Sequence, residues 1–303
     1  MKTLALALAA GLMAAPAFGQ AVNGEYRPFY GSAVAVQQVG TGFGDANVGD
    51  LQFANGSELN AAFYANDGTN LRLLLTGNLE SNFNKLELFF DTGAAGGQSS
   101  VNGSGVGAMN NLTGFTFDTG FRANFWLSVT GGDIGGGVYG MFVDGAALSG
   151  TGATGGYLGT NDGQNGGALS GGANFLNALV AINNSNTSGV GGGPANVGSP
   201  LLSQTGIEIA IPWASLGVAP GSEMRVMAFI NGQNHDYASN QFLGALPAGT
   251  GNLGGDGNGG FNGSVGQLNM NNFAGNQFFV IPTPGAAALL GLGGLAAFRR
   301  RRA

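Results

Sequence analysis

Hydrophobic residues occur along the chain in short runs, and glycine or asparagine separates one run from the next. Residues 85–91 show the pattern most simply. Leu86, Leu88 and Phe90 fall on one side of an extended chain, and the intervening residues fall on the other. We therefore predict a strand at 85–91 that places Leu86, Leu88 and Phe90 against a core.

A hairpin is predicted directly before this strand. Residues 59–65 and 71–76 are short β-like runs, and the sequence Asn66-Asp67-Gly68 lies between them. Asparagine, aspartate and glycine tolerate the positive φ angles that tight turns require. The two runs should therefore pair as antiparallel neighbours.

The clearest predicted strand is 206–213, in which three isoleucines alternate with other residues until Pro212 ends the run. A short helical turn should follow, and 224–230 is predicted to return as the partner strand. Because 224–230 is apolar on both faces, it should lie centrally in a sheet. Further β segments are expected at 29–39, 121–129 and 138–143, and 175–182 is predicted as a strand or a short helix.

Glycine shapes the rest of the chain, with 60 residues out of 303. Each glycine costs a helix about 1 kcal/mol relative to alanine, so long helices are excluded from most of it. The glycine-rich stretches 145–172 and 183–200 are predicted to be long loops. Short strands with turn residues between them predict an all-β fold, an antiparallel, jelly-roll-like β-sandwich with long Gly/Asn-rich loops, in one domain at 22–280.

The N-terminal residues 1–21 have the features of a secretory signal peptide. Lys2 precedes an apolar run from Leu4 to Ala15, and small residues follow it. Cleavage is expected between Gly19 and Val22. The body of the protein should therefore be exported.

The C-terminal residues 281–303 form a second signal. Two prolines break any incoming element, 285–298 lacks polar side chains, and four arginines follow. We predict a C-terminal apolar helix, at the short end of the lengths that span a bilayer, with its arginines on the cytoplasmic side. The alternative is a core helix with a solvated basic end.

This tail resembles the sorting signal of PEP-CTERM proteins, with threonine in place of the family's usual glutamate. The residues that carry the resemblance are the triplet Pro282, Thr283 and Pro284 and the cluster Arg299, Arg300, Arg301 and Arg302. The resemblance implies processing by an exosortase-type transpeptidase. It also implies a place at the cell surface or in the extracellular matrix, with the C-terminal helix as a transient or permanent membrane anchor.

Charge and cysteine content exclude several functions. The two terminal signals contain five of the ten Lys and Arg residues. The body therefore has five basic and sixteen acidic residues, which gives it a net charge of −11. Such a body is not expected to bind nucleic acid, because neutralising phosphates requires clustered Lys and Arg. The chain has no cysteine, which excludes thiol chemistry and Cys-ligated zinc.

A second resemblance concerns residues 205–232. A strand containing Glu208 ends in Ile211-Pro212-Trp213, turns and returns as an apolar strand. This order resembles the late strands of DOMON-like and family 9 carbohydrate-binding sandwiches. The resemblance implies a sandwich fold, and it assigns no binding residue.

Four aromatic residues are candidates for stacking on sugar rings. Trp126 and Trp213 lie within strand patterns and should belong to the core. Tyr157 and Tyr237 lie in expected loops, so they are the predicted ligand-binding residues.

No catalytic site is expected. The triplets at 91–93 and 118–120 both read Asp-Thr-Gly, as in aspartic proteases, but they are too close in sequence to carry two lobes and should shape turns. His235 is the only histidine, and no nucleophile elbow accompanies it, so a structural or surface role is expected.

Metal sites are not expected from the residue types present, since a single histidine without cysteine makes a poor transition-metal site. The glycine-flanked acidic residues at 161–163 and 255–259 should form plain turns, with a loop Ca²⁺ as the alternative. The sequence thus predicts an exported, non-enzymatic structural or interaction protein of the cell surface or extracellular matrix. The alternative is a carbohydrate-binding module for exopolysaccharide or cell-wall glycan.

Overall fold

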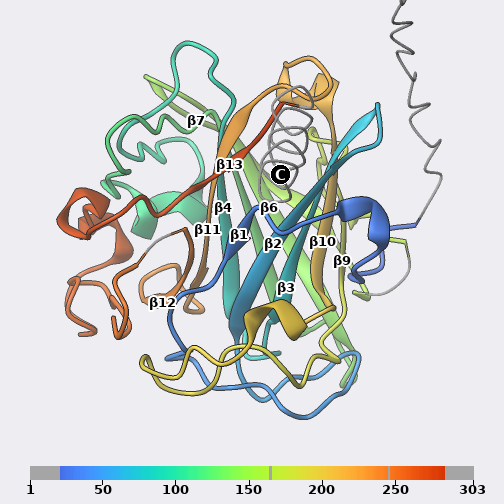
Figure 1. The fold of residues 1–303 in the computed structure, drawn as a ribbon. Helices are drawn as coiled ribbons and strands as arrows, with labels where there is room; N and C mark the ends of the chain where they lie inside the picture. The colour runs from blue at the N-terminus through green and yellow to red at the C-terminus, as the bar shows by residue number, and fades with distance from the viewer. Residues whose placement is uncertain (1–20, 164–165, 245, 284–303) are drawn as a thin grey trace, which may run out of the picture.

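The computed structural model describes residues 21–163, 166–244 and 246–283. These residues form two antiparallel sheets that enclose a shared core (Figure 1). The predicted all-β, sandwich-like fold is confirmed. The signal peptide and the apolar tail fall on residues 1–20 and 284–303, outside the described ranges.

The smaller sheet has five strands, in the order β1 (Ala35–Val36), β2 (Glu58–Asn66), β3 (Asn70–Asn78), β10 (Gly206–Pro212) and β9 (Leu179–Ile182). The larger sheet has the order β12 (Ala238–Leu243), β11 (Met224–Asn231), β4 (Lys85–Asp91), β5 (Phe125–Asp133), β6 (Tyr139–Ser149), β7 (Gly152–Asn161) and β8 (Ser170–Gly171), and β13 (Phe279–Ile281) also pairs with β11. Short 3₁₀ helices complete the described elements: η1 (Pro28–Tyr30), η2 (Gly107–Leu112), η3 (Pro200–Leu202), η4 (Trp213–Leu216), η5 (Val265–Gln267) and η6 (Met270–Asn272).

The predicted hairpin is confirmed. Strands β2 and β3 are antiparallel neighbours, with Ala62 opposite Leu75, and their register shifts once, between Leu59 and Ala61. In the turn between them, the side-chain oxygen of Asn66 accepts a hydrogen bond from the backbone N–H of Gly68 at 2.9 Å. The local turn chemistry therefore sets this pairing.

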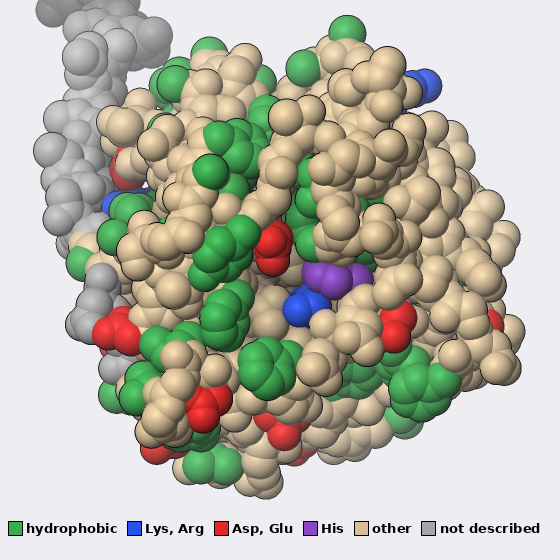
Figure 2. Space-filling view, turned by 180° about the vertical axis from the view of Figure 1, so that it is seen from behind, with side chains coloured by type: hydrophobic (Ala, Val, Ile, Leu, Met, Phe, Trp, Pro, Cys, Tyr) green, Lys and Arg blue, Asp and Glu red, His purple; other side chains and the backbone are tan. Residues whose placement is uncertain are grey.

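The core between the sheets contains the inward residues of both. As predicted, Leu86, Leu88 and Phe90 of β4 face it. The opposite face of β4 is also buried, because loops around η2 and after β12 cover it, and Phe89 packs there with Phe115 in a second apolar cluster. The larger sheet is therefore covered on its outer face as well, although Figure 2 shows a hollow in this side of the molecule.

The prediction that 206–213 and 224–230 are partner strands is wrong. Strand β10 pairs with β3 and β9, whereas β11 pairs with β4 and β12, so these consecutive strands lie in different sheets. Pro212 has no N–H to continue the ladder, and η4 begins directly after it. The chain crosses from one sheet to the other here. Strand β11 lies inside its sheet, between β12 and β4, although it is only one strand away from the edge.

The predicted loop at 145–172 is also wrong, because the end of β6, all of β7 and β8 lie within it. Glycine is needed there for close backbone contact. A Cβ atom on Gly155 would lie 2.1 Å from the carbonyl oxygen of Gly145 on the neighbouring strand. The other predicted loop, 183–200, contains no strand or helix before η3, and 175–182 ends in strand β9.

The last described strand leads directly into the predicted sorting motif. Strand β13 ends at Ile281, and Pro282 and Thr283 follow it. Within residues 21–163, 166–244 and 246–283, every helix is too short to cross a membrane.

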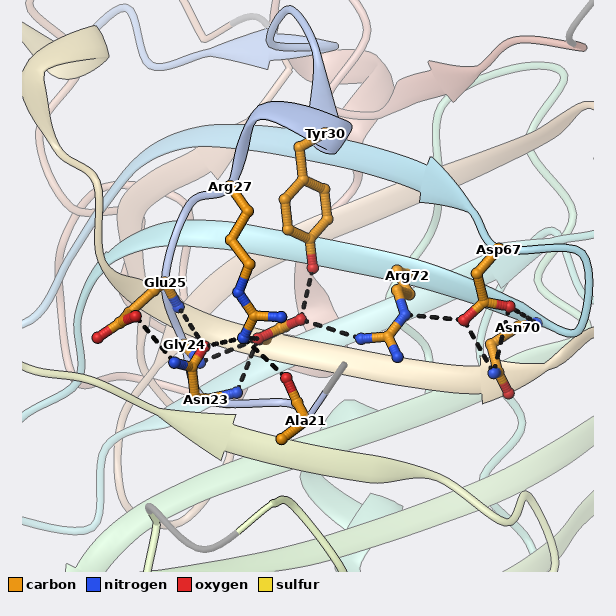
Figure 3. A network of polar contacts seen from close by, with 10 residues as sticks. Ala21, Asn23, Gly24, Glu25, Arg27, Tyr30, Asp67, Asn70 and Arg72 are labelled. Carbon is orange, nitrogen blue, oxygen red and sulfur yellow. Dashed lines mark hydrogen bonds and ion pairs between the residues drawn. The ribbon is translucent and has the colours of Figure 1, made fainter. Parts of the chain in front are cut away.

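The segment 21–31, here called the N-terminal clasp, lies on the outer face of the smaller sheet (Figure 3). Its anchor is Glu208 of β10, which is completely buried. The carboxylate accepts hydrogen bonds from the backbone N–H of Asn23 at 2.8 Å and the hydroxyl of Tyr30 at 2.7 Å. It also pairs with Arg72 of β3 at 3.3 Å. One buried carboxylate thus ties the N-terminal clasp to the sheet.

A second buried carboxylate, Glu58 at the start of β2, controls a pH dependence. Its side chain accepts hydrogen bonds from Asn60 and Asn186 at 2.8 and 2.9 Å, and burial raises its pKa to about 7. Between pH 4.5 and 7 the folded protein therefore holds a proton that the unfolded chain has released, so stability falls as pH rises through this window.

Replacing Glu58 tests this linkage. We expect Glu58→Gln to remove a fall of about 3 kcal/mol in the free energy of unfolding across that window. Urea unfolding at a series of pH values measures it. Glu223→Gln, at an exposed position, is the control and should keep the wild-type slope. An unchanged slope in Glu58→Gln would show that this carboxyl group does not titrate as described.

Candidate functional site

A cleft of about 470 Å³ opens beside the 231–237 loop, which joins β11 to β12. The loops that line it gather beside these strands, on the left in Figure 1. Its lining comes from distant parts of the chain: Gly42, Phe43, Asn84, Gly232, Gln233, Asn234, Asp236, Tyr237, Asn252 and Phe261. We call this feature the aromatic cleft.

Three rings form a row in the aromatic cleft. Tyr237 stacks on Phe261 with ring centroids 4.3 Å apart, and it also stacks on Phe43 with ring centroids 5.8 Å apart. The hydroxyl of Tyr237 donates to the carbonyl oxygen of Gly259 at 2.9 Å, which fixes the ring. Phe261 is 86% exposed, so the row ends in an apolar surface open to solvent.

Polar side chains border this surface. Gln233 and Asn234 are exposed, Asp236 is half-buried, and these three side chains make no hydrogen bond within the described part of the chain. They come from a loop that Asn231 shapes, since its side-chain oxygen accepts from the N–H groups of both Gly232 and Tyr237. The cleft therefore combines aromatic rings with polar side chains whose hydrogen-bonding groups are available to a ligand.

The other side of the 231–237 loop faces a group of charged residues, here called the charged hollow: Lys85, Glu87, Asp144 and His235. Figure 2 shows histidine, basic and acidic side chains meeting in the hollow on this face. Nδ1 of His235 lies 2.5 Å from the buried carboxylate of Glu87, which also accepts from Nε1 of Trp126 at 2.8 Å. Lys85 donates to the hydroxyl of Thr130 at 2.9 Å.

The charges in the hollow set one another's pKa values. Burial alone would raise the pKa of Glu87, but the charge and hydrogen bond of His235, with smaller effects from Trp126 and Lys85, hold it below its usual value. Burial raises the pKa of Asp144, which His235 and Lys85 oppose only in part. Burial likewise lowers the pKa of Lys85. The two carboxyl groups therefore differ in how readily they ionise.

The structure places the predicted aromatic residues in different surroundings. Tyr237 lines the aromatic cleft, whereas Tyr157 lies on β7, partly exposed and outside that cleft. Trp126 and Trp213 are buried, as predicted. The sequence analysis missed Phe261, whose signal was an isolated large aromatic residue in a glycine-rich loop.

The other candidate residues shape local structure. An Asp91 oxygen accepts from the N–H of Gly93 at 2.9 Å, and Asp118 accepts from the N–H of Gln277 at 2.7 Å. Asp256 accepts from the N–H groups of Asn258 and Gly260, as in a plain turn. His235 is buried. Within the described ranges, no three histidine or acidic side chains are grouped so that they could hold a metal ion.

Comparison with known proteins adds no relative. No protein-family model matches the chain, and no curated protein or solved structure is significantly similar to it. A function must therefore be argued from the aromatic cleft, the charged hollow and the terminal signals.

Proposed function

We propose that the chain is an exported protein of the cell surface or extracellular matrix that binds polysaccharide through the aromatic cleft. The observation that carries this proposal is the exposed ring of Phe261 stacked on Tyr237. Large apolar groups held open to solvent beside polar groups mark binding surfaces. The C–H face of a sugar ring can cover such aromatic rings, while its hydroxyl groups reach the surrounding polar side chains.

The cleft favours a neutral glycan. Each amide of Gln233 and Asn234 offers both donors and acceptors, which matches sugar hydroxyl groups that also do both. Asp236 is the one charged group in the lining, and the body carries a net charge of −11. Anionic polymers, nucleic acid among them, would therefore be repelled, and a neutral exopolysaccharide or cell-wall glycan is the proposed ligand.

Binding without catalysis is the proposed activity. Glycoside hydrolysis normally uses two carboxyl groups that flank the scissile bond. The lining of the aromatic cleft contains only Asp236. The cleft is thus suited to hold a glycan and lacks the pair of groups that would cleave it.

The proposed location rests on the two ends of the chain. Val22 is completely buried beside Ala181 and Ala210, so cleavage ahead of Val22 removes only Ala21 from the N-terminal clasp and keeps the residues that bind Glu208. The sorting motif begins where β13 ends, which places Pro282 and Thr283 next to the folded body. We propose processing by an exosortase-type transpeptidase, with the C-terminal apolar helix as membrane anchor. We propose further that the two sheets form a jelly-roll-like sandwich.

A glycan array tests the proposed function. Purified residues 22–283 are applied to an array of neutral, amino and acidic glycans. We expect saturable retention on at least one neutral glycan, with free oligosaccharide of the same type competing. Absence of retention on every neutral glycan would contradict the proposal.

A further inference from the structure

The outer face of the larger sheet carries a row of side chains that extends from the charged hollow to β7. Glu87 on β4 lies opposite Ser128 on β5, Ser128 lies opposite Asp144 on β6, and Asp144 lies opposite Tyr157 on β7. Residues paired in this way point to the same face of a sheet, and neighbouring strands are about 4.8 Å apart. The row is therefore about 14 Å long.

Two polar groups in this row make no hydrogen bond within the described part of the chain. The hydroxyl of Ser128 is completely buried and makes no hydrogen bond. The carboxylate of Asp144, which is only partly buried, also makes none. Buried polar groups without partners are costly unless a molecule from outside the chain satisfies them. The floor of the row thus retains hydrogen-bonding capacity for water or a ligand.

The mixture of groups indicates the chemistry of the ligand. Asp144 offers acceptors, Lys85 offers N–H donors, and His235 has its Nε2 atom left over from the contact with Glu87. Asp144 would repel a phosphate, and Lys85 would repel an ammonium group. A hydroxyl group both donates and accepts hydrogen bonds, so it can bind to each of the three side chains Asp144, Lys85 and His235. Tyr157, 39% exposed, adds an aromatic surface at the end of the row.

We propose that the charged hollow is a second saccharide subsite, in which Tyr157 stacks on a neutral sugar unit and Asp144 accepts hydrogen bonds from its hydroxyl groups. The inference rests on the proposed function and extends it to the other side of the 231–237 loop. His235 faces the hollow, and the next residues along the chain, Asp236 and Tyr237, line the aromatic cleft. One glycan chain that crosses this loop would occupy both subsites.

The single histidine provides a direct test. In residues 22–283 prepared without a histidine tag, His235 is the only source of imidazole signals, so ¹⁵N-histidine labelling gives one reporter in the hollow. The probes are glucose, galactose, mannose and N-acetylglucosamine. We expect at least one to shift the His235 resonance saturably. Asp144→Asn should weaken that sugar's affinity about tenfold or more, because it replaces a charged acceptor.

Controls separate this inference from the proposed function. Phe261→Ala should lose retention on the array but keep the His235 shift, and Glu223→Gln should keep both. Tyr157→Ala, at an exposed position, should weaken the shift even if Asp144→Asn fails to fold. The inference is overturned if no sugar moves the His235 resonance. It is also overturned if Asp144→Asn folds and both Asp144→Asn and Tyr157→Ala show the same sugar-dependent His235 shift as the wild type. Retention on the array that depends on Phe261 would then leave the proposed function standing alone.

Discussion

Glu208→Ala is expected to lower the free energy of unfolding by about 3–5 kcal/mol, the largest effect we expect from a single substitution in this fold. The carboxylate is completely buried and holds Arg72, Tyr30 and the backbone N–H groups of the N-terminal clasp. Removing it takes away one of the carboxylates that neutralise the buried guanidinium of Arg72, which also pairs with Asp67 at 2.8 Å. Urea unfolding of residues 22–283 measures the change.

Two further variants and a second readout sharpen this test. Glu208→Gln keeps the shape and one acceptor, so its loss should be intermediate, and Glu223→Gln, at an exposed site, should change stability by less than about 0.5 kcal/mol. Release of the clasp in Glu208→Ala should speed chymotryptic cleavage after Tyr26. If Glu208→Ala unfolds at the same urea concentration as Glu223→Gln, Glu208 is not the anchor described.

Phe261→Ala is expected to weaken glycan binding about tenfold or more while leaving stability nearly unchanged. The ring is 86% exposed, so its removal leaves no cavity in the core, but it takes away the open end of the aromatic row. Titration calorimetry with the glycan retained on the array measures the affinity. Urea unfolding of the same variant checks its stability.

The matched control is Phe175→Ala, which removes an exposed phenyl ring that does not line the cleft. It should bind as the wild type does. Tyr237→Ala should lose affinity and some stability, because this ring also contacts Phe43 and donates to Gly259. Equal affinities in the wild type and Phe261→Ala, or an equal loss in Phe175→Ala, would place glycan binding elsewhere on the molecule.

Local chemistry allowed part of the fold to be predicted. The Asn66-Asp67-Gly68 turn specifies its hairpin because the hydrogen bonds lie within the turn itself. The alternation at 85–91 likewise identifies the core-facing side of β4. The pairing of β10 was not predictable in this way, since its neighbours β3 and β9 are separated from it by long stretches of chain. Inward-facing isoleucines suit either sheet equally well.

The candidate sites show the same limit more strongly. Tyr237 was predicted as a ligand-binding residue from its place in a polar loop, but its partners Phe43 and Phe261 come from other loops. His235 and Glu87 are 148 residues apart in sequence and meet only because β11 pairs with β4. The glycines of β7 were predicted to belong to a loop, but in the structure they allow close contact between neighbouring strands. Only the assembled sheets bring these groups together.

We propose that the body lies outside the cell and is held there by polysaccharide through the aromatic cleft. The most direct measurement uses intact cells that make the full chain with an epitope tag inserted after Gly150, in the exposed turn between β6 and β7. The cells are treated with enzymes that digest their outer polysaccharide. The amount of tail-processed protein that stays with the cells is then compared with the amount released into the medium. We predict that protease added outside removes the tag and that digestion releases the wild type, while Phe261→Ala is already free. A tag that stays protected inside the cells, or protein that stays bound after the polysaccharide is gone, would contradict the account.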